Sequence, residues 1–146
     1  MDDLSVVKGV IVGAVRPEGY AVLNADNPYT VKLGKKAKCK VAYFSIDEKN
    51  TVIAEHCKHG GIAAIFENGF ISIKKGEWKF RVEKVMSIPI TFGGRVTFMV
   101  QNVLAATLAA YLTGFATEEI ARSLATFIPS PAQTPGRLNI YDLSLI

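Results

Sequence analysis

Two polar side chains stand out in this sequence because of their surroundings. Asn102 is an amide inside an otherwise apolar helical segment, and Arg137 is a cation on a Pro-Gly turn after a long irregular stretch. An amide carries a donor and an acceptor, so it could match a purine edge, or it could be satisfied by solvent or a neighbouring carbonyl. A guanidinium could clamp a phosphate, or it could lie free on the surface. Spacing alone leaves both alternatives open for each residue.

Residues for catalysis or metal binding do not form a recognisable motif. The sequence contains no GxxxxGK(S/T) phosphate loop, no GxGxxG, no HExxH and no GxSxG. His56 and His59 lie beside Cys57 and could share one helical face as metal ligands, or simply form an exposed helix end. Without a carboxylate pair or a second cysteine cluster we favour the helix end, and we expect Cys39 and Cys57 to be free thiols. No catalytic residue and no metal ligand is predicted.

The composition is that of one globular domain. The chain has 146 residues, is 49% hydrophobic and 21% charged, and has a mean hydropathy of +0.23 without a run long enough to cross a bilayer. Its N-terminus lacks the basic and apolar regions of a secretory signal, so we expect a cytoplasmic protein without membrane contact. The net charge of +4 owes much to one stretch of five lysines: Lys32, Lys35, Lys36, Lys38 and Lys40.

This lysine stretch, residues 32–40, has two interpretations. It could be a solvated surface, as most charge runs are, or it could attract polyanions. No aromatic side chains interleave with the lysines as stacking platforms. We therefore favour the solvated surface and do not expect nucleic-acid binding.

The elements that would position Asn102 and Arg137 begin with a strand, a helix and a second strand. Helices are predicted over residues 4–15 and 28–33, and strands over 20–23 and 40–45. A polar turn at 24–28 follows the first strand. This alternation implies parallel strands joined by helical crossovers, as in an α/β fold.

The middle of the chain changes character after a predicted helix at 50–58. Three β runs, at 62–66, 70–74 and 78–85, are joined by loops too short for anything but antiparallel neighbours. We therefore expect a small three-stranded meander beside the parallel sheet, with Trp78 packed in it.

Two helices complete the predicted fold. Apolar residues at helical spacing predict a helix over 98–113, and Thr117 is expected to cap a second helix that extends to 127. The two should form an antiparallel pair, in which the alanines of the first helix allow close approach. The predicted class is α/β, with a parallel sheet and helical crossovers, a small antiparallel three-stranded meander and a C-terminal helix pair.

Taken in order, four segments resemble the Mur ligase family of ATP-dependent amide ligases. They are the strand and polar turn at 20–28, the stretch from Ile-Pro to Gly-Gly-Arg at 88–95, the helix start at 102–110, and Thr-Pro-Gly-Arg at 134–137. The resemblance implies that the amide at 102 contacts the adenine of ATP and that the arginine at 137 contacts its phosphates.

The sequence departs from the family pattern in two places. Asn27 stands where the family has a second acid after Asp26, and Phe98 and Met99 stand where many members have His-Asn. The first amide of the family's pair is therefore missing. Asn24 and Asp26 match the family motif without implying a particular ligand contact.

The resemblance also implies a division of the chain and a reaction. Residues 1–133 would be the later part of an ATP-binding central domain, and residues 134–146 the interdomain turn and the start of a following, truncated domain. The family's phosphate loop and magnesium ligands lie upstream, and its amino-acid-binding domain lies downstream. The fragment is therefore expected to be inactive and to hold no tightly bound cofactor. In the parent enzyme, ATP and Mg²⁺ would activate a carboxylate as an acyl phosphate.

Within the family, residues 98–102 and 130–137 are most similar to the branch that adds arginine to aspartate side chains of a polymer. ATP, arginine and the aspartate-backbone polymer are thus the implied partners of the parent enzyme. The alternatives are a peptidoglycan or folylpolyglutamate ligase of the same family, or a non-catalytic interaction module. Apolar faces exposed on a fragment favour self-association, so a homo-oligomer is expected.

Overall fold

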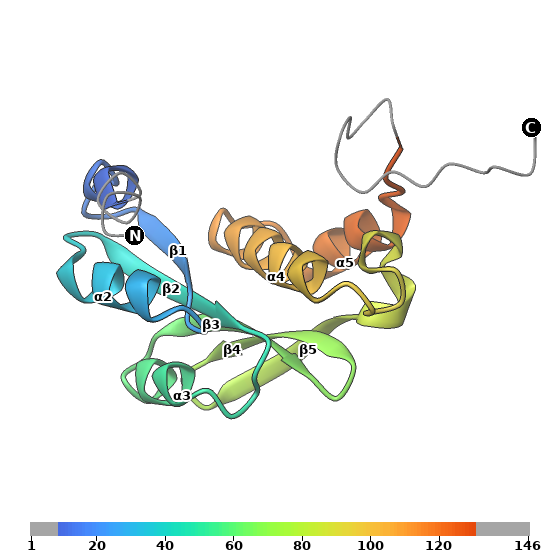
Figure 1. The fold of residues 1–146 in the computed structure, drawn as a ribbon, viewed down its shortest axis with the longest axis horizontal. Helices are drawn as coiled ribbons and strands as arrows, with labels where there is room; N and C mark the ends of the chain where they lie inside the picture. The colour runs from blue at the N-terminus through green and yellow to red at the C-terminus, as the bar shows by residue number, and fades with distance from the viewer. Residues whose placement is uncertain (1–8, 131–146) are drawn as a thin grey trace, which may run out of the picture.

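A five-stranded mixed sheet with helices on both faces forms the centre of the molecule (Figure 1). The computed structural model describes residues 9–130, of which 9–13 form a helical segment; the start of the predicted 4–15 helix lies outside the described residues. The further elements are β1 (Tyr20–Asn24), α2 (Pro28–Lys36), β2 (Lys40–Ser45), α3 (Thr51–Lys58), β3 (Ile62–Glu67), β4 (Phe70–Lys75), β5 (Trp78–Lys84), two short 3-10 turns (Val85–Ser87 and Pro89–Thr91), α4 (Thr97–Leu112) and α5 (Thr117–Thr126).

The strands follow one another across the sheet in chain order. β1 pairs with β2 and β2 with β3 in parallel, whereas β3 with β4 and β4 with β5 are antiparallel. The turn between β3 and β4 contains Asn68 and Gly69, both with positive φ, at 47° and 80°. Such a pair is typical of a tight hairpin turn. The predicted parallel half and the predicted meander are both confirmed.

Two hydrophobic layers lie on opposite faces of the sheet. Alternate residues of a strand point to opposite faces, so Tyr43 packs with α2 and α3, while Phe44 packs against α4. Leu104 and Leu108 of α4 are fully buried in the second layer. On the other face, α2 lies so close that a Cβ on Gly34 would fall 2.1 Å from the Tyr43 hydroxyl. The helices are therefore held at fixed positions over the sheet.

Two sequence predictions about side chains are wrong. Trp78 is 80% exposed, because it is the first residue of the edge strand β5 and the core contacts of that strand begin at Phe80. Thr117 is the first helical residue of α5 rather than its cap. The backbone N–H of Ala116, the residue before the helix, instead donates to the Glu119 carboxylate at 3.0 Å. Neither correction alters the order of the elements.

Candidate nucleotide-facing site

The beginning of α4 is fixed by a buried threonine. Thr91 is fully buried, and its hydroxyl lies 2.9 and 2.8 Å from the carbonyl oxygens of Val85 and Ile88, to which it can donate. The same oxygen accepts the N–H of Gly94 at 3.2 Å. Gly93 and Gly94 have φ values of 69° and 81°, a conformation that glycine adopts without steric cost in a tight turn. The first turn of α4 is therefore held in place over the sheet.

Asn102 lies on the exposed side of α4. The next two residues, Val103 and Leu104, are buried against the core, whereas Asn102 itself is exposed. Among the described residues, its amide makes one contact, from Nδ2 to the Met99 sulfur at 3.7 Å. Sulfur is a weak acceptor, and no carbonyl of the described chain satisfies the amide. Oδ1 and one N–H are therefore available to a ligand.

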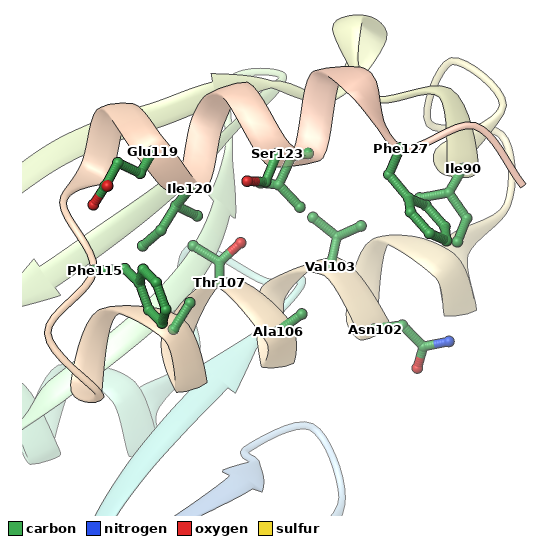
Figure 2. A pocket seen from close by; sticks show the side chains of 12 residues that line it. Ile90, Asn102, Val103, Ala106, Thr107, Phe115, Glu119, Ile120, Ser123 and Phe127 are labelled. Atoms are coloured by element: carbon green, nitrogen blue, oxygen red, sulfur yellow. The ribbon is translucent and has the colours of Figure 1, made fainter.

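A cavity of about 540 Å³ separates α4 from α5 (Figure 2). Asn102 contributes to one end of it, but its amide points away from the cavity. The predicted helix pair is present. The helices also approach each other closely, since Cα atoms of the two helices lie within 8 Å of one another, and Ala106 and Ala110 line the cavity between them. The other walls are mainly apolar and include Val103, Phe115, Ile120, Leu124 and Phe127.

Thr107 lies in the wall that α4 contributes to this cavity. Its side chain is fully buried, and its Oγ1 has no hydrogen-bond partner among the described residues. A buried hydroxyl without a partner costs on the order of 1–3 kcal/mol. The sequence does not signal this feature, because threonine is common at both exposed and buried helix positions.

A second set of polar residues lies at the carboxyl ends of β1 and β2. Asp26 accepts hydrogen bonds from the Ser45 hydroxyl, from the Ile46 N–H at 3.0 Å and from the Asn50 side chain at 3.1 Å. Asn50 also caps α3 through its Oδ1. Asn24 accepts the Asp26 N–H at 2.8 Å. We call Asn24, Asp26, Ser45 and Asn50 the strand-end cluster.

The rest of the turn at 24–28 is also used by the fold. The Asn27 side chain caps α2 by accepting the Tyr29 N–H at 2.9 Å. The Thr30 hydroxyl contacts the carbonyls of Asn24 and Asn27. The motif that carried part of the family resemblance therefore joins β1, β2, α2 and α3, and sequence reasoning missed Ser45, Asn50 and Thr30 as its partners.

His56 and His59 do not come together. His56 is half-buried with its ring edge-to-face against Tyr43 at 5.0 Å, and burial lowers its pKa, whereas the His59 side chain is 71% exposed after the end of α3. The described residues contain no group of three or more His, Cys, Asp or Glu placed to hold a metal ion. Cys39 and Cys57 are free thiols, as expected, and burial raises the pKa of Cys57.

The lysine stretch at 32–40 is a surface feature. All five lysines are exposed, which agrees with the solvated interpretation. Two of them nevertheless lie over tyrosine rings, Lys32 over Tyr29 at 5.8 Å and Lys40 over Tyr20 at 5.4 Å. These tyrosines lie outside the lysine run, so the sequence pattern did not show the contacts.

Of the two predicted site residues, the structure describes one. Asn102 has an exposed amide with one weak contact among the described residues. Arg137 lies outside the described residues, so its approach to Asn102 stays a prediction.

The order of the elements and the mixed sheet can be compared with those of known families. The family model of the Mur ligase middle domain matches residues 1–110, and the chain belongs to the Mur ligase family.

Within that family, the chain is 47% identical to the cyanophycin synthetase of Synechocystis sp. and 43% identical to that of Nostoc sp., each over 143 residues. These matches cover 98% of this chain but 16% of each relative, so the chain spans about a sixth of their length. It is also 35% identical over 126 residues to a UDP-N-acetylmuramoylalanine--D-glutamate ligase of Thermoanaerobacter sp., a match that covers 83% of this chain and 24% of that enzyme.

Across residues 9–130, none of the helices has the length and apolar character needed to cross a membrane.

Proposed function

We propose that this chain supplies the adenine-contacting part of the nucleotide site in an ATP-dependent amide ligase similar to cyanophycin synthetase. The observation that carries the proposal is the Asn102 amide, which is exposed and has only a weak contact among the described residues. The helix that bears it is anchored by buried side chains and by the Thr91 turn. The amide therefore needs little reorganisation to meet a ligand.

The chemistry of the two predicted residues suits a nucleotide. An asparagine side chain can accept from the adenine amino group and donate to a ring nitrogen at the same time. The Arg137 guanidinium can bind phosphate oxygens through two N–H groups. A magnesium ion does not fit the described residues, because they provide no cluster of carboxylates. The ion would be held by other parts of the parent enzyme.

The proposed reaction joins two amino-acid groups. ATP transfers its γ-phosphoryl group to a carboxylate and leaves as ADP; an amine then attacks the acyl carbon, and phosphate departs as the amide forms. We propose an aspartate side chain of a polymer as the carboxylate and arginine as the amine. The part of this chain is to hold and orient the nucleotide, and none of its residues is assigned a bond-making role.

A peptidoglycan ligase is the second candidate, supported by the 35% identity to the Thermoanaerobacter enzyme. The higher identity of 47%, over more of the chain, favours the cyanophycin-type assignment. No comparable observation supports a folylpolyglutamate ligase or an interaction module. Synthesis of an arginine amide by the parent enzyme would decide between the two ligases.

Nucleotide titration of the ¹⁵N-labelled chain tests the site. We expect adenosine to shift the Asn102 side-chain amide signals, and Asn102→Ala to weaken binding. Gln101→Ala is the matched control, because Gln101 is the neighbouring amide on the same helix and consecutive residues of a helix lie on different faces. Equal effects of the two substitutions would contradict the proposal.

An assay of phosphate release tests whether this chain alone can catalyse the reaction. With ATP, Mg²⁺, arginine and polymer primer, we expect release at background, since phosphoryl transfer needs positioned charge beyond one amide and one arginine. We also expect ATP to bind weakly. Robust turnover, or tight magnesium-dependent ATP binding by calorimetry, would refute the assignment of these residues to one part of a larger site.

The domain division at residue 134, a cytoplasmic location and a homo-oligomeric state are further parts of this proposal. Phe115 and Ile128, which are 58% and 67% exposed, provide apolar surface that supports self-association. A monomer in analytical ultracentrifugation would contradict the oligomer without affecting the nucleotide site.

A further inference from the structure

Phe98 lies one helical turn before Asn102 on α4. Residues four apart on a helix are neighbours on the same face, with about 5–6 Å between their Cβ atoms. Phe98 is 53% exposed, and no aromatic ring or cation of the described chain packs on its ring. Phe80, in contrast, is half-buried against the ring of Tyr111 at 5.7 Å. α4 therefore presents an unpaired ring next to an amide with one weak contact.

An exposed amide needs a second contact to hold a base. Water competes for each hydrogen bond that Asn102 can make, so such bonds add little net affinity. Stacking removes a face of the base from water, contributes more, and works for any base.

The direction of the Asn102 amide indicates which aromatic side chain could stack on a bound base. Phe115 and Phe127 line the cavity between α4 and α5, whereas the Asn102 amide points away from it (Figure 2). Phe98 does not line this cavity. Tyr111, the other aromatic residue of α4, packs against Phe80. Phe98 is thus the aromatic residue of α4 placed to stack on a base that the amide holds.

We infer that Phe98 is the stacking platform for the adenine ring and that Asn102 reads the edge of the same ring. This inference rests on the proposed function. The two neighbouring residues then have different roles. The Phe98 ring supplies affinity for any purine, and the Asn102 amide supplies the preference for a purine that carries a 6-amino group.

The test compares adenosine with purine riboside, which lacks the 6-amino group, in NMR titrations of the 146-residue chain. Phe98→Leu should weaken both nucleosides about tenfold, the loss expected when one stacked ring is removed. Stacking also moves the H2 and H8 signals of the base upfield. That movement should disappear in Phe98→Leu and return in Phe98→Tyr, a result that a purely structural role would not produce.

Asn102→Ala should instead remove the preference for adenosine over purine riboside, because the amide oxygen that accepts from the 6-amino group is lost. Phe115→Leu is the control, since Phe115 is similarly exposed, at 58%, but lines the cavity. An upfield shift that persists in Phe98→Leu, or an equal affinity loss in Phe115→Leu, overturns the stacking role and leaves the proposed function standing. Adenosine that fails to bind at its solubility limit, or an unchanged preference in Asn102→Ala, overturns both.

Discussion

The strand-end cluster and the exposed face of α4 hold polar side chains in opposite ways. At the ends of β1 and β2, Asp26 receives three hydrogen bonds from segments that lie up to 24 residues away in the chain. On α4, Asn102 has a single weak contact among the described residues. Both residues lie in segments that resemble family motifs. Asp26 uses most of its hydrogen-bonding capacity within the fold, whereas Asn102 leaves most of it available.

The difference shows how to separate structural from ligand-binding polar residues. A carboxylate that already accepts from a hydroxyl, an amide and a backbone N–H has little capacity left for a ligand. An amide with a free donor and acceptor, on a helix that is otherwise well packed, has its full capacity. The polar turn at 24–28 is therefore assigned to the fold, and Asn102 to binding.

Removing the Asp26 carboxylate is expected to give the largest effect. Asp26→Ala should lower the free energy of unfolding by about 2–3 kcal/mol, because three donors lose their shared acceptor. Urea unfolding followed by circular dichroism measures the loss. Asp26→Asn keeps one acceptor oxygen and should lose less; a stability equal to that of the wild type in Asp26→Ala would show that the cluster does not hold the strands together.

A smaller change of opposite sign is expected inside α4. Thr107→Val replaces a buried hydroxyl that has no partner among the described residues by a methyl group of similar shape. It should raise the free energy of unfolding by about 1 kcal/mol. Thr113→Val is the control, because the Thr113 hydroxyl is hydrogen-bonded to the Ala109 carbonyl at 3.1 Å. Stabilisation by both substitutions to the same extent would show that the missing partner of the Thr107 hydroxyl is not the cause.

His56 is expected to make the free energy of unfolding depend on pH. Burial lowers its pKa below the ordinary value, and its Nε2 lacks a partner among the described residues. As pH falls below about 6.5, the unfolded chain takes up a proton that the folded chain resists, so stability is lost; above that pH the folded state has no such cost. His56→Gln should flatten this part of the stability profile measured by urea unfolding.

The smallest effect on stability is expected at the residue with the largest role in binding. Asn102→Ala should change the free energy of unfolding by no more than about 0.5 kcal/mol, because the amide is exposed and weakly bonded. A loss as large as that of Asp26→Ala would place Asn102 among the structural residues and remove the contrast between the two regions.

Much of the fold could be predicted because it depends on local patterns. Short loops between 62 and 84 impose antiparallel pairing, and the earlier strand, helix and strand order imposes parallel pairing. Trp78 was mispredicted because its burial depends on how far the helices extend over β5, which no local pattern encodes. Thr117 was misplaced by one position, since the Glu119 carboxylate performs the capping.

The site could be predicted only in part, for a similar reason. The sequence singles out Asn102 as an amide in an apolar helix, but the direction of its side chain depends on where α5 packs. Asp26 is hydrogen-bonded to Ser45 and Asn50, which lie 19 and 24 residues away in the chain. These partners meet Asp26 only in the folded sheet. Arg137 remains predicted from its turn alone.

The exposed position of Trp78 decides what fluorescence can report about this molecule. Its indole, the single one in the chain, is already surrounded by solvent in the native state. Its emission therefore changes little when the hydrophobic layers come apart, although a partner that covered the end of the hairpin would shift it to shorter wavelength. In a Trp78→Phe background, Phe80→Trp would move the fluorophore into the packed layer and make its emission a signal of unfolding.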